Sequence, residues 1–127
     1  MKASAREFHH MLAATDPALV RLCLDLHWVW RGAENSMVAL EDIIQLYGDR
    51  VSELHIRQSQ GGIWDQTVGD GDIDMATVAM MLDAKGAKPL LVLEHAYEDA
   101  TPHTMETVAA HAASVAYVQR HFGAIAG

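Results

Sequence analysis

The sequence predicts an α/β fold in which three parallel strands are each followed by a helix, with one more helix ahead of the first strand. Segments of helical periodicity alternate with short, nearly continuous apolar segments, the pattern of parallel strands joined by crossover helices. The chain has 127 residues, an ordinary length for one hydrophobic core, and half of them are apolar. We therefore expect a single domain over residues 1–127.

The predicted helices carry start and stop signals. Ser36 and Asp74 are favourable N-caps, because their side-chain oxygens accept hydrogen bonds from free backbone N–H groups. Thr101-Pro102 combines a cap with proline at the first helical position. Four helices are predicted, over Ser4 to Ala14, Ser36 to Gly48, Asp74 to Lys85-Gly86, and Thr101 to about His121. Each helix is expected to have one apolar face. In the same order, these faces carry Phe8, Met11 and Leu12 in the first helix, Leu40, Ile43, Ile44 and Tyr47 in the second, Val78, Ala79 and Leu82 in the third, and Met105, Val108, Ala109, Ala112 and Val115 in the fourth.

Three apolar segments predict the strands. The first runs from Leu19 to Val29, the second from Val51 to Ser59, and the third from Leu90 to Ala96. A loop from Gln60 to Asp72 separates the second strand from the next helix. Three parallel strands form a small sheet with two open edges, whereas parallel sheets are normally covered on both faces. We therefore expect something further to complete the sheet.

Ionisable residues share one face of each predicted strand. Side chains two positions apart point to the same face. This rule groups Cys23 with Asp25 and His27, Glu53 with His55 and Arg57, and Glu94 with Leu90, Val92 and Ala96. The opposite faces are apolar and suit packing against helices. The ionisable groups lie toward the C-terminal ends of the strands, where α/β folds bind ligands.

Asp25, His55 and Glu94 form a candidate metal site. Two carboxylates and one imidazole are an O,O,N ligand set that suits Mn²⁺, Mg²⁺ or Co²⁺, with Zn²⁺ as a further candidate. Buried carboxylates are costly unless they are paired or bind a cation. A second interpretation is a buried ionic network of these groups with Arg57 and Arg31. Spacing alone leaves both interpretations open.

Four ordered segments carry a resemblance to a known family. They are Leu22-Cys-Leu-Asp-Leu-His-Trp, Leu46-Tyr-Gly-Asp-Arg-Val-Ser-Glu-Leu-His-Ile-Arg-Gln-Ser, Gly69-Asp-Gly-Asp-Ile-Asp and Leu91-Val-Leu-Glu. Together they resemble the xylose isomerase-like family of sugar phosphate isomerases and epimerases, whose members are TIM barrels. The resemblance covers nearly the whole chain and implies a partial TIM barrel, equivalent to strands six to eight of the C-terminal half. It implies a metal-dependent enzyme of carbohydrate metabolism.

The resemblance also implies roles for single residues. Asp25, His55 and Glu94 would be metal ligands, and Glu94 would be one of two catalytic carboxylates that move a proton next to a carbonyl through an enediolate. The family's other catalytic Glu lies on an earlier strand, so an incomplete site is expected in this chain. Relatives place His three positions after the first Asp, where this chain has Trp28. The residues expected to contact substrate are His27, Trp28, Arg57 and Trp64.

Charge and composition limit the classes of binding partner and the cellular compartment that we expect. A net charge of -8 disfavours nucleic acid, and with it a DNA-repair endonuclease on the same barrel. No apolar stretch suits a membrane span, no secretory signal is visible, and the single Cys23 fits a reducing cytoplasm. The expected ligand is a small sugar or sugar phosphate, and the expected partner is a second copy or a complementing barrel half. The alternative is a non-catalytic module that oligomerises to close a barrel, with the strand-end polar residues as structural ion pairs.

Overall fold

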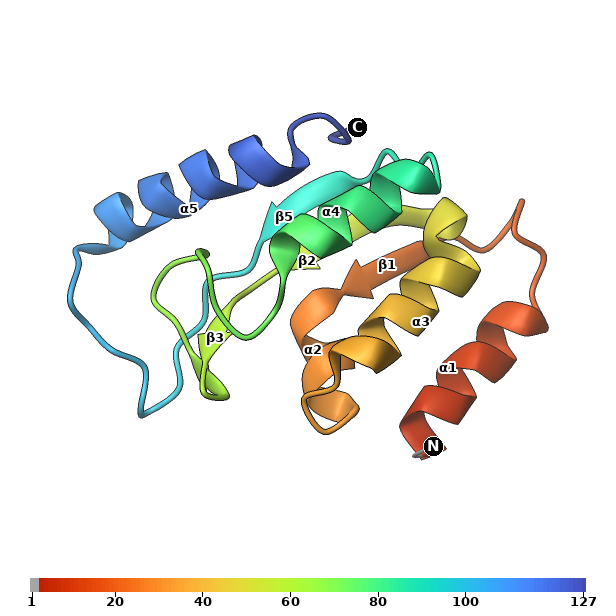
Figure 1. Cartoon of the computed structure of the whole chain (residues 1–127), viewed down its shortest axis with the longest axis horizontal. Coiled ribbons are helices and arrows are strands. Elements are labelled where there is room, and N and C mark those ends of the chain that lie inside the picture. The colour runs from red at the N-terminus through yellow and green to blue at the C-terminus, as the bar shows by residue number, and fades with distance from the viewer. Residues whose placement is uncertain (1–2) are drawn as a thin grey trace.

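The computed structural model describes residues 3–127, which form a mixed α/β structure (Figure 1). The elements in chain order are α1 (Ala3–Ala13), β1 (Leu22–Asp25), α2 (Leu26–Gly32), α3 (Met37–Tyr47), the short 3-10 helix η1 (Gly48–Arg50), β2 (Val51–Ile56), β3 (Ser59–Gln60), β4 (Ile63–Trp64), α4 (Met75–Ala84), β5 (Leu90–Leu93) and α5 (Thr107–Phe122). The predicted α/β class, with three parallel strands each followed by a helix, is confirmed.

The main sheet consists of β1, β2 and β5, all parallel, with β2 in the centre. Asp25 pairs in register with His55, and Leu93 pairs with Ile56. The backbone N–H of Glu94 donates to the carbonyl of Ile56 at 3.1 Å, which continues the ladder one residue beyond β5. The C-terminal ends of the three strands therefore meet at one edge of the sheet.

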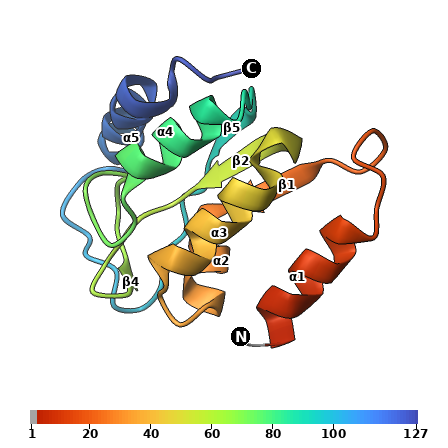
Figure 2. The ribbon, with the colours of Figure 1, turned by 45° about the vertical axis from the view of Figure 1, so that its right-hand side comes forward.

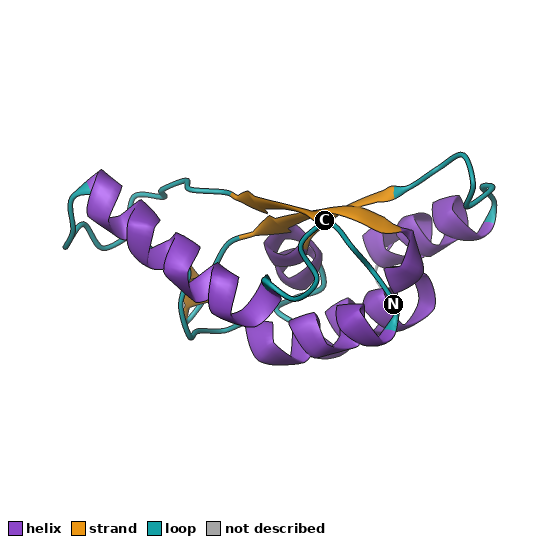
Figure 3. Ribbon diagram, turned by 90° about the horizontal axis from the view of Figure 1, so that it is seen from above, coloured by secondary structure: helices purple, strands orange, loops and turns teal. Residues whose placement is uncertain are grey.

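The helices pack on a single face of this sheet. Figure 2 shows α3 and α4 side by side across it, and the view along the sheet shows the helices of residues 3–127 on the same side (Figure 3). The core lies between this face and the helices, and its fully buried members include Leu24, Leu54, Leu40, Leu82 and Phe122. Full burial of one such side chain contributes about 1.5–3 kcal/mol, so this one-sided core stabilises the fold.

The other face of the sheet carries no helix from the described part of the chain (Figure 3). Strand alternation places Cys23, Glu53, His55 and Leu90 on that face, and these side chains are exposed or half-buried. Parallel sheets ordinarily have both faces covered. The uncovered face is therefore the place where a ligand or a further protein layer can approach the sheet.

The first strand is shorter than predicted. β1 ends at Asp25 and α2 begins at the next residue, whereas the sequence predicted a strand from Leu19 to Val29. Asp25 explains the early end, because its Oδ1 accepts a hydrogen bond from the Trp28 N–H at 2.9 Å and so caps α2. His27 and Trp28 therefore lie on a helix, and the prediction that His27 shares a strand face with Asp25 is wrong.

The other two strands also end early, β2 at Ile56 and β5 at Leu93. The segment predicted as a loop contains the antiparallel hairpin of β3 and β4. Gly61 and Gly62 form its turn with φ of +58° and +82°, a left-handed conformation that glycine adopts without strain. Each hairpin strand has only two residues, too few to show a periodicity in the sequence.

Most predicted helix ends and the apolar faces of α3 and α4 are confirmed. Ser36 caps α3 and Asp74 caps α4 through their side chains, and each helix buries the predicted apolar residues except half-buried Tyr47. In α1, Leu12 is buried but Met11 is 47% exposed, and the side chain of Phe8 lies outside the described residues. Across residues 3–127, no helix is long and apolar enough to cross a membrane.

The last helix departs from the prediction. α5 begins at Thr107, after the N-cap residue Glu106, and not at Thr101-Pro102. Thr101 instead closes a turn, in which its Oγ1 accepts a hydrogen bond from the Glu98 N–H at 2.9 Å. The predicted apolar face is wrong, since Val108 is 83% exposed. The helix buries a different set: Ala110, Ser114, Tyr117, Val118 and Phe122.

Candidate metal centre

Asp25, His55 and Glu94 converge where the three parallel strands end. Asp25 is the last residue of β1, His55 is its register partner in β2, and Glu94 directly follows β5. Each residue offers one ligand atom, and these atoms lie within 4.8 Å of one another. All three residues are half-buried. The parallel register thus assembles the O,O,N group that the sequence singled out.

Two carboxylates of like charge, those of Asp25 and Glu94, meet in this triad. Burial raises the pKa of Asp25, the Trp28 N–H lowers it, and the nearby Glu94 carboxylate raises it again, so that the pKa lies above its usual range. Two adjacent carboxylates in a half-buried site repel each other unless a proton or a cation compensates their charge. The residues present therefore fit a bound divalent cation.

Asp25 and His55 do not bond to each other directly. Asp25 uses Oδ1 to cap α2, while its Oδ2 lies 4.0 Å from Nδ1 of His55. This separation is too long for a direct hydrogen bond. A cation could therefore engage both atoms without breaking a bond between them.

Arg57 is buried against Glu94. Its Nη2 lies 2.8 Å from Oε2 of Glu94, and its side chain is only 5% exposed. Arg31 pairs instead with Glu98, at 3.3 Å. The structure therefore agrees in part with the ionic-network interpretation. Of its two arginines, Arg57 pairs with Glu94 of the triad, whereas Arg31 pairs with Glu98 in the segment after β5.

Trp28 and Trp64 flank the Arg57 side chain. The guanidinium carbon of Arg57 lies 3.9 Å from the ring centroid of Trp64 and 5.9 Å from that of Trp28. The two indole rings meet edge to face, with centroids 5.7 Å apart. Trp28 is 51% exposed, so part of this aromatic surface is open to solvent beside Glu94. Three of the four residues predicted to contact substrate, Trp28, Arg57 and Trp64, therefore lie next to one another.

The fourth, His27, lies inside the protein. It has no exposed surface, and its Nε2 lies 3.0 Å from Oγ of Ser59. Ser59 donates its own proton to Oδ2 of Asp72 at 2.7 Å, so Nε2 of His27 carries the proton that Ser59 accepts. Burial, with smaller contributions from Arg31 and Arg57, lowers the pKa of His27 to about 4. His27 is therefore a neutral side chain that contacts the β3–β4 hairpin through Ser59.

Glu98 is a site residue that the sequence did not reveal. Its Oε1 accepts a hydrogen bond from the backbone N–H of Trp64 at 2.7 Å, and its carboxylate pairs with Arg31. Arg31 also donates to the carbonyl of Gly62. These contacts hold the β3–β4 hairpin in place and so fix the ring of Trp64. Glu98 lies in an irregular segment after β5, where no periodicity or motif marks it.

Asp72 fixes the other side of the hairpin. Its carboxylate accepts hydrogen bonds from the N–H groups of Gly61 and Gly62, at 3.0 and 2.7 Å, and from Ser59. Partial burial raises the pKa of Asp72, but these hydrogen bonds outweigh it, and the pKa lies below its usual value. The ionised form is thus the one that the fold stabilises.

Asp72→Asn is expected to destabilise the protein at neutral pH and to have a smaller effect in acid. A carboxyl group with a lowered pKa in the folded state adds stability above its unfolded value of about 4, and this contribution is lost as pH falls through the lowered pKa. The measurement is the free energy of unfolding of both proteins at neutral pH and at about pH 3. An equal difference at the two pH values would contradict the assignment.

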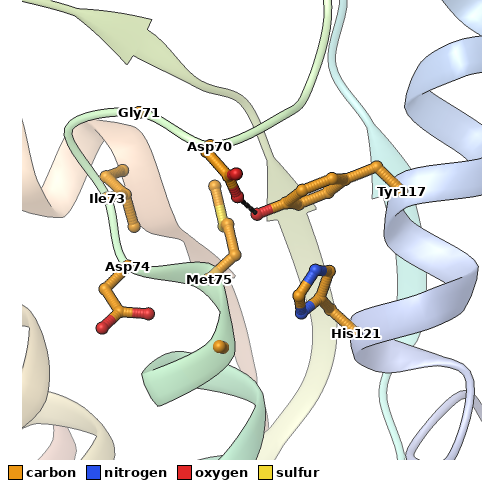
Figure 4. A pocket seen from close by; sticks show the side chains of 8 residues that line it. Asp70, Gly71, Ile73, Asp74, Met75, Tyr117 and His121 are labelled. Atoms are coloured by element: carbon orange, nitrogen blue, oxygen red, sulfur yellow. Dashed lines mark hydrogen bonds between the residues drawn. The ribbon is translucent and has the colours of Figure 1, made fainter.

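A separate cavity lies between the loop before α4 and the helix α5 (Figure 4). Its volume is about 230 Å³, and its lining includes Asp70, Asp74, Met75, Tyr117 and His121. The Tyr117 hydroxyl donates to Oδ1 of Asp70 at 2.8 Å. Burial, together with this bond, raises the pKa of Tyr117 to about 12. Tyr117 therefore stays protonated and ties α5 to the loop.

The chain was compared with known protein families, with characterised proteins and with solved structures, and none of the three comparisons finds a match.

Proposed function

We propose that this chain is a metal-dependent sugar or sugar phosphate isomerase/epimerase-like protein. One observation carries the proposal: three successive parallel strands deliver Asp25, His55 and Glu94 to one point, with ligand atoms within 4.8 Å of one another. Carboxylate and imidazole ligands of this kind suit Mn²⁺, Mg²⁺ or Co²⁺, and Zn²⁺ as a further candidate. The resemblance of the sequence to xylose isomerase-like enzymes supports the same assignment.

We further propose that the sheet is part of a TIM barrel. Its helices cover one face, as the outer helices of such barrels do, and its other face carries the polar side chains. The strands β1 and β5 are the two edges of the sheet. A second copy of the chain or a complementing barrel half would pair with these edges and close the barrel. We place the protein in the cytoplasm on the strength of its single cysteine.

The chemistry proposed is proton transfer next to a carbonyl. A bound divalent cation would polarise the substrate's carbonyl and hydroxyl oxygens. Glu94 is the candidate proton acceptor, and Arg57 holds one of its oxygens at 2.8 Å. The exposed part of Trp28 offers a flat apolar surface for a sugar, and Trp64, which packs against Arg57, is the candidate contact beside it. The second catalytic carboxylate would come from the part that completes the barrel, so this chain alone is expected to have an incomplete site.

Divalent cations are expected to stabilise the folded chain, because the triad binds them only when its strands are paired. At a cation concentration 100 times Kd, the gain is about 2.7 kcal/mol, or roughly 10 °C in Tm. Thermal unfolding is measured with Mn²⁺ or Mg²⁺, which prefer oxygen ligands, and after chelation. The gain should disappear in Glu94→Gln and His55→Ala. It should persist in Asp83→Asn, which removes one charge from an exposed position of α4.

The competing function is a non-catalytic module whose polar strand-end residues are structural ion pairs. The pair between Arg57 and Glu94 at 2.8 Å is the observation that favours it. In this case neither Mn²⁺ nor Mg²⁺ changes Tm, and Glu94→Gln lowers it in the presence and absence of these cations alike, because buried Arg57 loses its partner. That result would reject the metal site and with it the isomerase proposal.

A further inference from the structure

A second group of side chains on the open face of the sheet has the composition of a metal site. Cys23 and Glu53 are register partners on the neighbouring strands β1 and β2, and His55 follows Glu53 by two residues on the same face. Their ligand atoms lie within 4.8 Å of one another. Cys23 is exposed, and the side chains of Glu53 and His55 are 39% and 26% exposed.

We infer that Cys23, Glu53 and His55 bind a thiophilic divalent cation such as Zn²⁺. Sγ of Cys23 lies 3.5 Å from Oε1 of Glu53, and the same oxygen lies 2.7 Å from Nε2 of His55. Sulfur, carboxylate oxygen and imidazole nitrogen are the three donor types of protein zinc sites. Three protein ligands leave the fourth tetrahedral position to water or to a bound molecule, as in open zinc sites.

His55 presents a different nitrogen to each group. Nε2 lies against Glu53, whereas Nδ1 is the atom that lies 4.0 Å from Asp25. The two sites also differ in chemistry, because only the second contains sulfur. Hard cations such as Mg²⁺ and Mn²⁺ prefer oxygen ligands, whereas thiolate selects softer ions. The thiophilic site is thus defined by Cys23 and Glu53 and does not depend on the isomerase proposal.

Binding is a ligand exchange without a redox step. The Cys23 thiol releases its proton to solvent, the sulfur–metal bond forms, and one metal-bound water leaves for each ligand that enters. Neither the thiol nor the cation changes oxidation state. Glu53 and His55 replace their mutual hydrogen bond by bonds to the cation, and the proton that His55 Nε2 donates to Glu53 moves by way of solvent to Nδ1, which leaves Nε2 free to bind.

Co²⁺ is the probe, because it gives a strong near-ultraviolet charge-transfer band when thiolate binds it and none with oxygen and nitrogen ligands alone. The chain has one cysteine, so the band reports on Cys23. The reduced protein is titrated with Co²⁺ at two protein concentrations. We expect the band to saturate at about one ion per chain, to be lost in Cys23→Ser, and to be removed by excess Zn²⁺. Glu53→Gln should weaken binding at least about tenfold, whereas Glu94→Gln should retain the band.

A second measurement needs no variant. Zn²⁺ should slow alkylation of Cys23 in the unaltered protein, and chelation should restore the rate. The inference is overturned if saturating Co²⁺ gives no charge-transfer band with a fully reduced thiol. It is equally overturned if Glu53→Gln binds Co²⁺ as tightly as the parent chain, or if the band requires two chains and disappears on dilution.

Discussion

Arg50→Ala is expected to lower the free energy of unfolding by about 2–5 kcal/mol, since each buried group left without its hydrogen-bond partner costs about 1–3 kcal/mol. Arg50 is 5% exposed. Its guanidinium donates to the carbonyl of Leu12 at 2.6 Å, to the carbonyl of Val20 at 2.8 Å, and to Oγ1 of Thr15 at 2.9 Å. These groups lie at the end of α1 and in the segment leading into β1. Alanine would leave buried carbonyls without partners and detach α1 from the start of β2.

Arg21→Ala is the matched control, because Arg21 is an exposed arginine next to the start of β1. Exposed side chains of this kind contribute less than about 1 kcal/mol. Urea unfolding followed by circular dichroism gives both free energies. Similar values for the two variants would mean that the Arg50 hydrogen bonds do not anchor α1.

Gly71→Ala is expected to destabilise the protein by about 1–3 kcal/mol and to disturb the β3–β4 hairpin. A Cβ atom on Gly71 would lie 2.5 Å from the carbonyl oxygen of Ser59 and 2.6 Å from the Gln58 side chain. The Ser59 carbonyl is backbone and cannot turn away, so the loop itself would have to move. Ser59 also contacts His27 and pairs with Trp64 across the hairpin. A shift of Ser59 should therefore also move Trp64.

Gly69→Ala lies in the same loop and provides the comparison. A Cβ at Gly69 has no atom within 4 Å, so this variant should unfold at nearly the parent temperature. The readouts are Tm and tryptophan fluorescence, which reports on the Trp64 environment. Equal Tm values for the two alanine variants would show that the close approach of Gly71 to Ser59 imposes no constraint.

The sequence predicts the sheet and the metal group because both depend on strand periodicity. Alternation of polar and apolar residues along a strand determines the face of each side chain. The C-terminal ends of parallel strands meet at one edge, and this places Asp25, His55 and Glu94 together. The caps Ser36 and Asp74 are predictable for an equally local reason, since one side-chain oxygen near the helix start suffices.

Features that depend on tertiary contacts are not predictable in this way. His27 fits the alternation of β1, but Asp25 ends that strand by capping α2, and nothing in the periodicity distinguishes a cap from a strand residue. The β3–β4 hairpin is held by Glu98, Arg31 and Asp72, which are far apart in sequence. The hydrogen bonds of these residues form only in the folded chain, and no local sequence pattern indicates them.

The two carboxylate oxygens of Asp25 have different neighbours. Oδ1 fixes the first turn of α2 through the Trp28 amide, and Oδ2 faces the imidazole of His55. If a cation binds at Oδ2, its occupancy and the capping of α2 would be linked through one rigid, planar group. A cation that draws Oδ2 forward must tilt the whole carboxylate, and the orientation of the Trp28 indole at the rim would follow. The proposed occupancy would then reach the surface through the hydrogen bond between Asp25 and the Trp28 amide.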